Sequence, residues 1–265
     1  MPGSADPRPP DAERPAADMV WAQNVSRRFG ALTAVDAVSF RLAAGGIVGL
    51  VGSDGAGKTT LLRMVAGMIA PSAGAIRVAG RDTAAERAAV KELIGYMPQR
   101  FGLYPDLSVA ENFEFFMDIY GIDGAERGRR RERYLGFSNL LPFLERRAGD
   151  LSGGMKQKLG LACVLVHEPR LLILDEPTNG VDPVSRREFW QILAEMRQAG
   201  MTLLVSTAYL DEAERCDRLL LMHNARIVAD AVPGQVRAGF ASLEEAIIQR
   251  IQAVDTALAE DPFGR

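Results

Sequence analysis

The chain has 265 residues, of which 48% are hydrophobic and 25% charged, as in an ordinary soluble globular protein. The formal net charge of −3 provides no overall attraction to nucleic acid or to anionic lipid. The two cysteines, Cys163 and Cys216, cannot build a disulfide framework and suit a reducing compartment. Only His167 and His223 are histidines, which argues against a histidine-built metal site.

The first 18 residues are rich in proline, alanine and charge, and they lack the apolar segment of a secretory signal. We predict a disordered tail over residues 1–18. No apolar run in the sequence approaches the roughly 20 residues needed to cross a bilayer. A role at a membrane would therefore require another chain to supply the spanning part.

Strands and helices alternate from residue 19 onward. Short strands are predicted at residues 19–25 and 34–42, and residues 45–52 form the continuous apolar run of a strand buried on both faces. A helix over residues 61–69, a strand over 75–80, a surface helix over 83–93 and a strand over 94–99 follow.

Residues 108–144 have a helical pattern with one apolar face, formed by Val109, Phe113, Phe116 and Tyr120. Within this block, residues 124–136 are dense in arginine. Acidic residues interrupt the arginines, which favours a solvated helix face over a nucleic-acid patch. The arginines concerned are Arg127, Arg129, Arg130, Arg131 and Arg133.

The next helix, over residues 153–167, is predicted to begin at an N-cap, Ser152. Its expected buried stripe is Leu159, Ala162, Cys163 and Val166. A strand over 171–177, a helix over 183–200, a strand over 201–207 and a hairpin over 218–230 follow. A terminal amphipathic helix is indicated by Leu243, Ile247, Ile251, Val254 and Leu258. This alternation predicts a largely parallel sheet covered on both faces, into which the helical block is inserted.

The strongest motif lies between a predicted strand and a predicted helix, and it fits G-x-x-x-x-G-K-[ST]. The glycines allow backbone N–H groups to surround a β-phosphate, and the helix N-terminus adds a positive dipole. Lys58 is expected to bridge the β- and γ-phosphates, while the Thr59 hydroxyl ligates Mg²⁺. The predicted nucleotide-binding residues here are Gly52, Ser53, Asp54, Gly55, Ala56, Gly57, Lys58, Thr59 and Thr60.

Two carboxylates follow at the end of the strand predicted over residues 171–177. Asp175 is expected to hold Mg²⁺ through water, and Glu176 to polarise an attacking water as general base. Another carboxylate, Asp54, lies inside the anion-binding segment. Its side chain can point outward, since the phosphate cradle is built of backbone.

The segment Leu-Ser-Gly-Gly-Met at residues 151–155 provides a second anion site at a helix start, through Ser152, Gly153 and Gly154. Together with the preceding motifs, it makes residues 20–232 closely similar to the ATPase subunit of ABC transporters. The resemblance implies a P-loop NTPase α/β core with a mostly parallel sheet, an N-terminal antiparallel β subdomain and an inserted α-helical subdomain. The implied domains are an ATPase domain over 19–232, with the insertion at about 100–168, and a helical extension over 233–265.

Further positions match the family in order. The resemblance implies that Phe29 stacks on adenine, although an ordinary packed phenylalanine fits the sequence equally well. It implies that Gln99 reaches Mg²⁺ and the attacking water, and that Asp182 belongs to the loop between two nucleotide sites. In the family, two such domains sandwich two ATPs head to tail, each site joining one chain's phosphate loop to the other chain's Ser-Gly-Gly segment.

Residues 100–121 resemble the export-type subgroup, whose ATPases bind an integral-membrane permease. The resemblance implies a peripheral location at the cytoplasmic face of a membrane and no nucleic-acid partner. Phe101, Leu103 and Tyr104 are candidate contacts with the permease, and the core of the helical insertion is an equally good interpretation of these residues.

Ala208 stands where the family has a histidine that contacts the γ-phosphate. We therefore predict a site that binds ATP well and hydrolyses it slowly. A homodimer would be slow throughout, whereas in a heterodimer the intact Ser-Gly-Gly segment would serve a complete partner site. Asp54 together with Ala208 resembles the first half of tandem-ATPase exporters and favours the heterodimer. The alternatives are an ABC-type ATPase of translation or DNA repair, and a clamp gated by ATP with little turnover.

Overall fold

The computed structural model describes residues 18–255, so residues 1–17 of the predicted tail over 1–18, together with Leu258, lie outside the described residues. The amino-terminal strands form a four-stranded antiparallel sheet in the order β2-β1-β4-β5. Its strands are β1 (Val20–Phe29), β2 (Leu32–Leu42), β4 (Ala73–Val78) and β5 (Arg81–Asp82). The predicted strand over 19–25 therefore extends further, to the turn that leads into β2.

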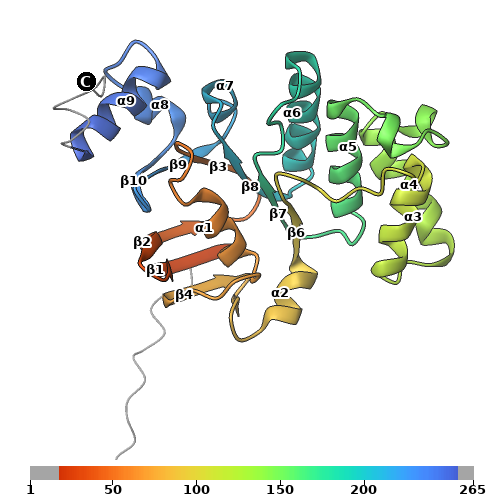
Figure 1. The fold of residues 1–265 in the computed structure, drawn as a ribbon, viewed down its shortest axis with the longest axis horizontal. Helices are drawn as coiled ribbons and strands as arrows, with labels where there is room; N and C mark the ends of the chain where they lie inside the picture. The colour runs from red at the N-terminus through yellow and green to blue at the C-terminus, as the bar shows by residue number, and fades with distance from the viewer. Residues whose placement is uncertain (1–17, 256–265) are drawn as a thin grey trace, which may run out of the picture.

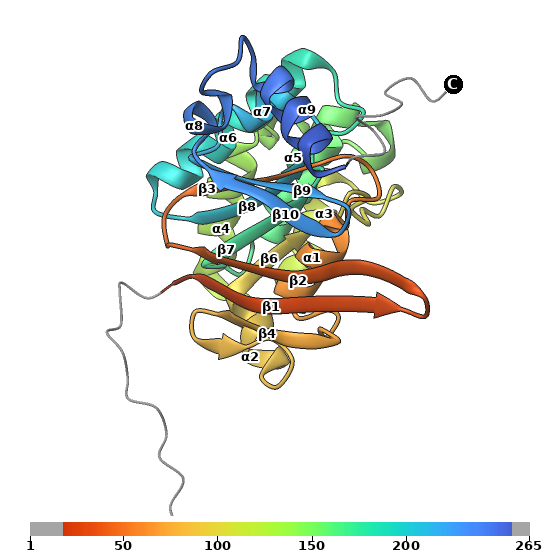
Figure 2. The same ribbon diagram turned by 90° about the vertical axis from the view of Figure 1, so that its left-hand side faces the viewer.

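The second sheet has six strands in the order β10-β9-β3-β8-β7-β6, and it is parallel except for the edge strand β10. Its strands are β3 (Ile47–Val51), β6 (Ile94–Met97), β7 (Leu171–Asp175), β8 (Thr202–Thr207), β9 (Arg218–His223) and β10 (Arg226–Ala231). The mostly parallel sheet and the antiparallel sheet are as predicted. β2 runs beside β10 (Figure 2), where Asp36 and Arg226 form an ion pair of 2.6 Å.

Helices cover both faces of the parallel sheet, and alternate residues of its buried strands point to opposite faces. In β3, Val48 and Leu50 pack toward α1 (Lys58–Val65), which lies between the two sheets. Ile47 and Val51 pack into a second core, on the side of α5 (Gly153–Val164) and α6 (Pro183–Gln198). This two-sided burial explains why β3 is a continuous apolar run.

The chain between β6 and β7 forms the helical block at one end of the molecule (Figure 1). It contains α3 (Val109–Ile119), α4 (Gly124–Phe137), the 3-10 turns η1 (Leu141–Phe143) and η2 (Ala148–Asp150), and α5. On the predicted apolar face of α3, Val109 and Phe113 are fully buried, whereas Tyr120 is exposed. The stripe predicted on α5 is buried, and burial raises the pKa of the Cys163 thiol.

The arginines of α4 form ion pairs instead of an unpaired basic patch. Arg127 binds Glu114 and Asp118 of α3 at 2.6 and 2.7 Å, and Arg133 binds Glu168 at 3.1 Å. The remaining arginines are paired in the same way, Arg129 and Arg130 with Glu126 and Arg131 with Glu114. Their charge is neutralised locally, and they tie α4 to α3 and to the end of α5.

Phe101 and Leu103 are half-buried and pack against the core of the helical block. The Phe101 ring lies over Gly160 of α5, where an added Cβ would stand 3.1 Å from the ring. Tyr104 is 45% exposed. Phe101 and Leu103 therefore contribute to the packing of the insertion, and Tyr104 is the exposed candidate contact.

Four short or terminal helices complete the described chain. The predicted surface helix over 83–93 is shorter as α2 (Arg87–Leu93), because the Asp82 carboxylate accepts hydrogen bonds from Ala84 and Ala85 and holds a turn. α7 (Leu210–Ala213) follows the corner after β8, and α8 (Pro233–Arg237) lies in the segment predicted as a helical extension. α9 (Leu243–Val254) lies beside α8 at the end opposite the helical block, and it buries Leu243 and Ile247.

Within residues 18–255, no helix is both long enough and apolar enough to pass through a bilayer.

Candidate functional site

The backbones of two neighbouring strands lie close against the loop between β3 and α1. A Cβ on Gly52 would stand 2.1 Å from the Met222 carbonyl oxygen, and a Cβ on Gly57 would stand 2.1 Å from the Ala34 carbonyl oxygen. Gly57 also has φ 105°, which non-glycine residues rarely adopt. Glycine is therefore required at both positions for the loop to turn into α1.

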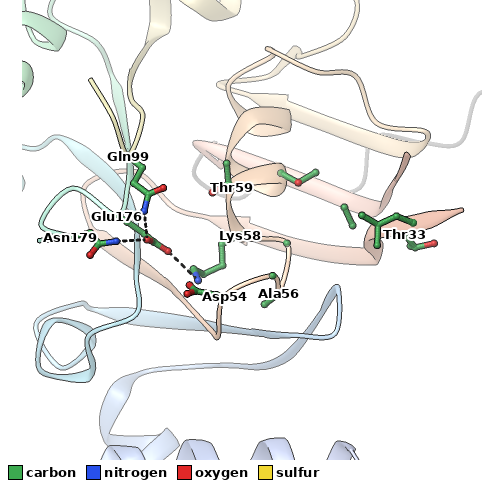
Figure 3. A pocket seen from close by; sticks show the side chains of 13 residues that line it. Thr33, Asp54, Ala56, Lys58, Thr59, Gln99, Glu176 and Asn179 are labelled. Carbon is green, nitrogen blue, oxygen red and sulfur yellow. Dashed lines mark hydrogen bonds and ion pairs between the residues drawn. The ribbon is translucent and has the colours of Figure 1, made fainter. Parts of the chain in front are cut away.

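This loop borders a cavity of about 470 Å³. Residues 32–34 of β2 form one wall, residues 54–60 form the floor, and Gln99, Glu176 and Asn179 form the opposite wall (Figure 3). Lys58 is buried beneath it, with its Nζ donating to the carbonyl oxygens of Gly52 at 2.8 Å and Ser53 at 3.1 Å. The predicted phosphate loop and the predicted catalytic carboxylate thus face the same space.

Asp175, at the end of β7, is 1% exposed and is surrounded by hydroxyl groups. Its Oδ1 accepts from the Thr59 hydroxyl at 3.0 Å and from the Ser206 hydroxyl at 2.8 Å, and its Oδ2 accepts from the Tyr96 hydroxyl at 3.3 Å. Burial, and secondarily the nearby Asp175 charge, raise the pKa of Tyr96. These contacts fix the Asp175 carboxylate beside the first turn of α1.

Glu176 links its own wall of the cavity to the floor. Its Oε1 lies 3.3 Å from Lys58 Nζ, and its Oε2 accepts from Gln99 at 3.0 Å and from Asn179 at 3.3 Å (Figure 3). Its backbone has φ 49°, in the left-handed region that is costly for a residue with a Cβ. The Glu176 N–H donates to Ser206 Oγ at 2.9 Å and to the Ser206 carbonyl at 3.2 Å, which holds this conformation.

The donor set beside Glu176 suits a hard cation. The Thr59 hydroxyl and the Asp175 carboxylate are in contact, and the Gln99 side chain lines the same cavity as Thr59. No group of three or more His, Cys, Asp or Glu residues that could hold a metal occurs in residues 18–255. A Mg²⁺ site there would therefore use few protein oxygens, as is usual where phosphate oxygens and water complete the coordination.

The Ser-Gly-Gly segment lies apart from this cavity and lines none of it. Ser152 is the N-cap of α5, as predicted, and its hydroxyl accepts from the Met155 N–H at 3.3 Å. Ser152 and Gly153 are exposed, whereas Gly154 packs so closely on α6 that an added Cβ would stand 2.4 Å from Ser185. The segment and the cavity therefore share no lining residue.

Asp182 is the N-cap of α6 and accepts from the N–H groups of Ser185 at 2.9 Å and Val184 at 3.1 Å. The hydrogen bond from Ser185 holds the pKa of the Asp182 carboxyl below its ordinary value. The residue therefore ends the loop that begins at Glu176 and starts the next helix.

Three predicted positions lie at or beyond the rim of the site. Asp54 is exposed and lines the cavity. Phe29 is 45% exposed at the end of β1, under the Arg27 guanidinium at 4.5 Å, so it is not an ordinary core phenylalanine. Ala208, directly after β8, is exposed and does not belong to the cavity lining.

Three residues of the site were not predicted: Tyr96, Asn179 and Ser206. Tyr96 and Ser206 lie on β6 and β8, which flank β7 in the sheet. Their polar side chains near the carboxyl ends of predicted strands were the available signal, because parallel strands gather these ends at one edge. Asn179 follows Glu176 by three residues and had no such signal.

With this geometry established, known proteins provide an independent comparison. The family described as "ABC transporter" matches residues 35–179. The chain is 48% identical over 217 residues to a "Probable multidrug ABC transporter ATP-binding protein YbhF" of Escherichia coli. That match covers 81% of this chain and 38% of the relative, so most of the relative lies outside it. A "Nod factor export ATP-binding protein I" of Paraburkholderia xenovorans is 39% identical, over 81% of this chain and 71% of the relative.

Solved structures support the same fold. A structure described as the ATP-binding subunit of an ABC transporter superposes with a TM-score of 0.78 at 31% identity, covering 88% of this chain and 99% of the other. A dimeric ABC cassette, MJ0796, bound to ADP and Pi superposes with a TM-score of 0.72 at 23% identity, covering 81% of this chain and 98% of the other. The phosphate loop, the paired carboxylates and these similarities agree: the chain belongs to the ABC transporter family of ATP-binding domains, which are ATPases.

Proposed function

We propose that the chain is the ATP-binding and hydrolysing subunit of an ABC exporter, and that it works through ATP-driven head-to-tail dimerisation. The observation that supports this best is the separation of the phosphate loop cavity from the exposed Ser-Gly-Gly segment at the start of α5. Two separate half-sites in one chain are useful only when a second domain completes each of them. Within the subunit, residues 19–232 form the ATPase domain, about 100–168 its helical insertion, and 233–265 the extension.

The contacts in the cavity give each group a role. When ATP binds, Lys58 gives up its hydrogen bonds to the carbonyl oxygens of Gly52 and Ser53 and holds the β- and γ-phosphates. The backbone N–H groups of residues 53–60 surround the phosphates. Thr59, Asp175 and Gln99 hold Mg²⁺, which neutralises charge on the phosphates when bound. Glu176 orients and polarises the attacking water, and Phe29 stacks on adenine beside the wall formed by β2.

Ala208 removes one group from this arrangement. A histidine at the end of β8 would donate a hydrogen bond to charge developing on the γ-phosphate, and alanine has no side-chain donor. Preorganised donors of this kind contribute about 10²–10³ in rate. The binding groups are unaffected, so we expect the site to bind ATP tightly and hydrolyse it slowly.

The substitution Ala208→His tests the slow site in the purified full chain. Because Ala208 is exposed directly after β8, an imidazole has room at this position. We expect ATP turnover to rise by about tenfold or more, with the ATP dissociation constant unchanged. A wild-type rate already equal to that of the variant would contradict the proposal. A rate near zero in both proteins would favour a clamp that binds ATP without useful turnover.

We further propose that the subunit lies at the cytoplasmic face of a membrane, bound to an integral-membrane permease and paired with a second, complete ATPase. The relatives named as multidrug and export ATP-binding proteins support the exporter, and the exposed Tyr104 is the candidate permease contact. Purification from membranes in mild detergent is the test. A permease together with a second ATPase is the expected result. A permease with this chain alone would support a homodimer, and a soluble nucleic-acid complex would contradict transport.

A further inference from the structure

Glu212, in α7, is a buried carboxylate that lies outside the cavity wall. It is only 1% exposed. Its two oxygens accept separate hydrogen bonds, Oε1 from the Thr178 hydroxyl at 2.6 Å and Oε2 from the Thr207 hydroxyl at 2.6 Å. Hydrogen bonds to an ionised acceptor are short and strong, and a carboxylate is rarely buried without such partners.

The two threonines belong to segments that are far apart in the sequence. Thr178 lies two residues after Glu176, in the loop that ends at Asp182. Thr207 is the last residue of β8, immediately before Ala208. Both are 1% exposed, so neither hydroxyl has water as an alternative partner. The Glu212 carboxylate therefore joins the loop that contains Glu176 to the end of β8.

A second contact joins α6, which follows this loop, to the corner after β8. The Arg186 guanidinium of α6 lies 4.4 Å from the ring centre of Tyr209 and 3.7 Å from the Asp211 carboxylate. Tyr209 donates its N–H to Thr207 Oγ1 at 3.0 Å. The loop over residues 176–182 is thus attached to the corner after β8 near its start, through Glu212, and just beyond its end, through Arg186.

The placement of this loop determines where the Glu176 carboxylate points. Glu176 has a left-handed backbone, and its Oε2 accepts from Asn179 of the same loop at 3.3 Å. A shift of the loop at Thr178 would move both groups relative to Lys58. A displacement of about 1 Å at a catalytic group can cost about 10²-fold in rate.

We infer that Glu212 is a positioning residue for ATP hydrolysis, which holds the loop over residues 176–182 so that Glu176 faces the phosphate loop. It acts through Thr178 and is not among the residues that line the cavity. The inference rests on the proposed role of Glu176. Because Ala208 offers no side-chain hydrogen bond, Glu212 and Ser206 provide the side-chain links between the end of β8 and this loop.

Two variants each remove the attachment at Thr178: Glu212→Ala and Thr178→Val. In the full chain we expect single-turnover hydrolysis of radiolabelled ATP to fall about 10- to 100-fold in both. The dissociation constant of a fluorescent ATP analogue should stay within about twofold of wild type, since the phosphate loop is untouched. Thr83→Val is the matched control, because Thr83 is 1% exposed and its hydroxyl has no hydrogen-bond partner. Its rate and affinity should not change.

Glu212→Gln is the rescue variant. Its amide oxygen can accept from one threonine while its NH₂ group donates to the other hydroxyl oxygen, so we expect a rate within about fivefold of wild type. Equal rates in wild type and a folded Glu212→Ala variant would overturn the inference. So would parallel losses of rate and ATP binding, since these would report only a smaller folded fraction.

Amide hydrogen exchange provides a readout that does not need turnover. Exchange in residues 176–182 should accelerate in Glu212→Ala and Thr178→Val, but not in Thr83→Val. A wild-type chain that hydrolyses no ATP would contradict the proposed function, and the exchange comparison would then decide alone whether Glu212 holds the loop. Unchanged exchange in both variants would overturn the inference.

Discussion

The carboxyl ends of β7 and β8 are paired in one sheet through Asp175 and Ser206, yet they are built differently. β7 ends in two carboxylates that face the phosphate loop, and Glu176 lines the cavity. β8 ends in two buried hydroxyls, Ser206 and Thr207, followed by the exposed Ala208. In the proposed function, the end of β7 presents the reactive groups, whereas the end of β8 supports them and contributes no side chain of its own to the phosphates. Three substitutions test this division, in order of decreasing expected effect.

Glu176→Gln should have the largest effect. The amide keeps the size of the side chain and can still bond with Gln99, but it cannot take a proton from water. We expect hydrolysis to fall by about 10²–10⁴-fold, with ATP binding retained. Rate and affinity are measured as for the variants of Glu212, and Glu92→Gln, on the exposed surface of α2, is the control. A small loss would assign the base to another group and remove the contrast between the two strand ends.

Ser206→Ala should have an intermediate effect on rate. It removes the hydroxyl that contacts both Asp175 and the Glu176 N–H, so we expect about 1–3 kcal/mol less free energy of unfolding and about tenfold slower hydrolysis. Thr202→Val is the control at the opposite end of the same strand, where the Thr202 hydroxyl accepts from Gly45 at 3.0 Å. It should lose similar stability without losing rate. Equal rate losses in both would show that β8 acts only through stability.

Tyr96→Phe should have the smallest effect on rate. The hydrogen bond from Tyr96 to Asp175 is long, at 3.3 Å, so its loss should cost under about 1 kcal/mol and slow hydrolysis less than about fivefold. A larger loss would mean that β6, and not β8 alone, supports the carboxylates.

The same variant has a pH signature. The pKa of Tyr96 is raised in the folded state, chiefly by burial, above the unfolded value of about 10. Its contribution to stability is therefore complete below pH 10 and is lost as the pH rises through the folded pKa. Urea unfolding between pH 8 and 11 should show a weaker alkaline decline in the variant. Part of the decline should persist, because burial also raises the pKa of Tyr134 to about 12.

Much of the molecule could be predicted from local patterns. The alternation of apolar and helical segments indicated the sheet, and the burial of Cys163 followed from its place on the helix after Ser152. The phosphate loop could be recognised from its glycines. Two of them, Gly52 and Gly57, are required because the strands beside the loop leave no room for a Cβ. The pairing of the α4 arginines with Glu114, Glu126 and Glu168 had only a partial signal, since the interrupting acids were visible but their partners across helices were not.

The sequence by itself determined the chemistry: a lysine and a threonine after a glycine-rich turn, two adjacent carboxylates, a Ser-Gly-Gly helix start and an alanine after β8. Local motifs record these because each depends on residues close in the chain. Only the tertiary structure decided which side chains support them. The order of the strands brings Ser206 to Asp175 and Glu176, and it brings Tyr96 to Asp175. The packing of the loop brings Glu212 to Thr178. Such contacts join residues separated by about 30 to 80 positions in the chain, and burial in a close-packed interior makes them selective.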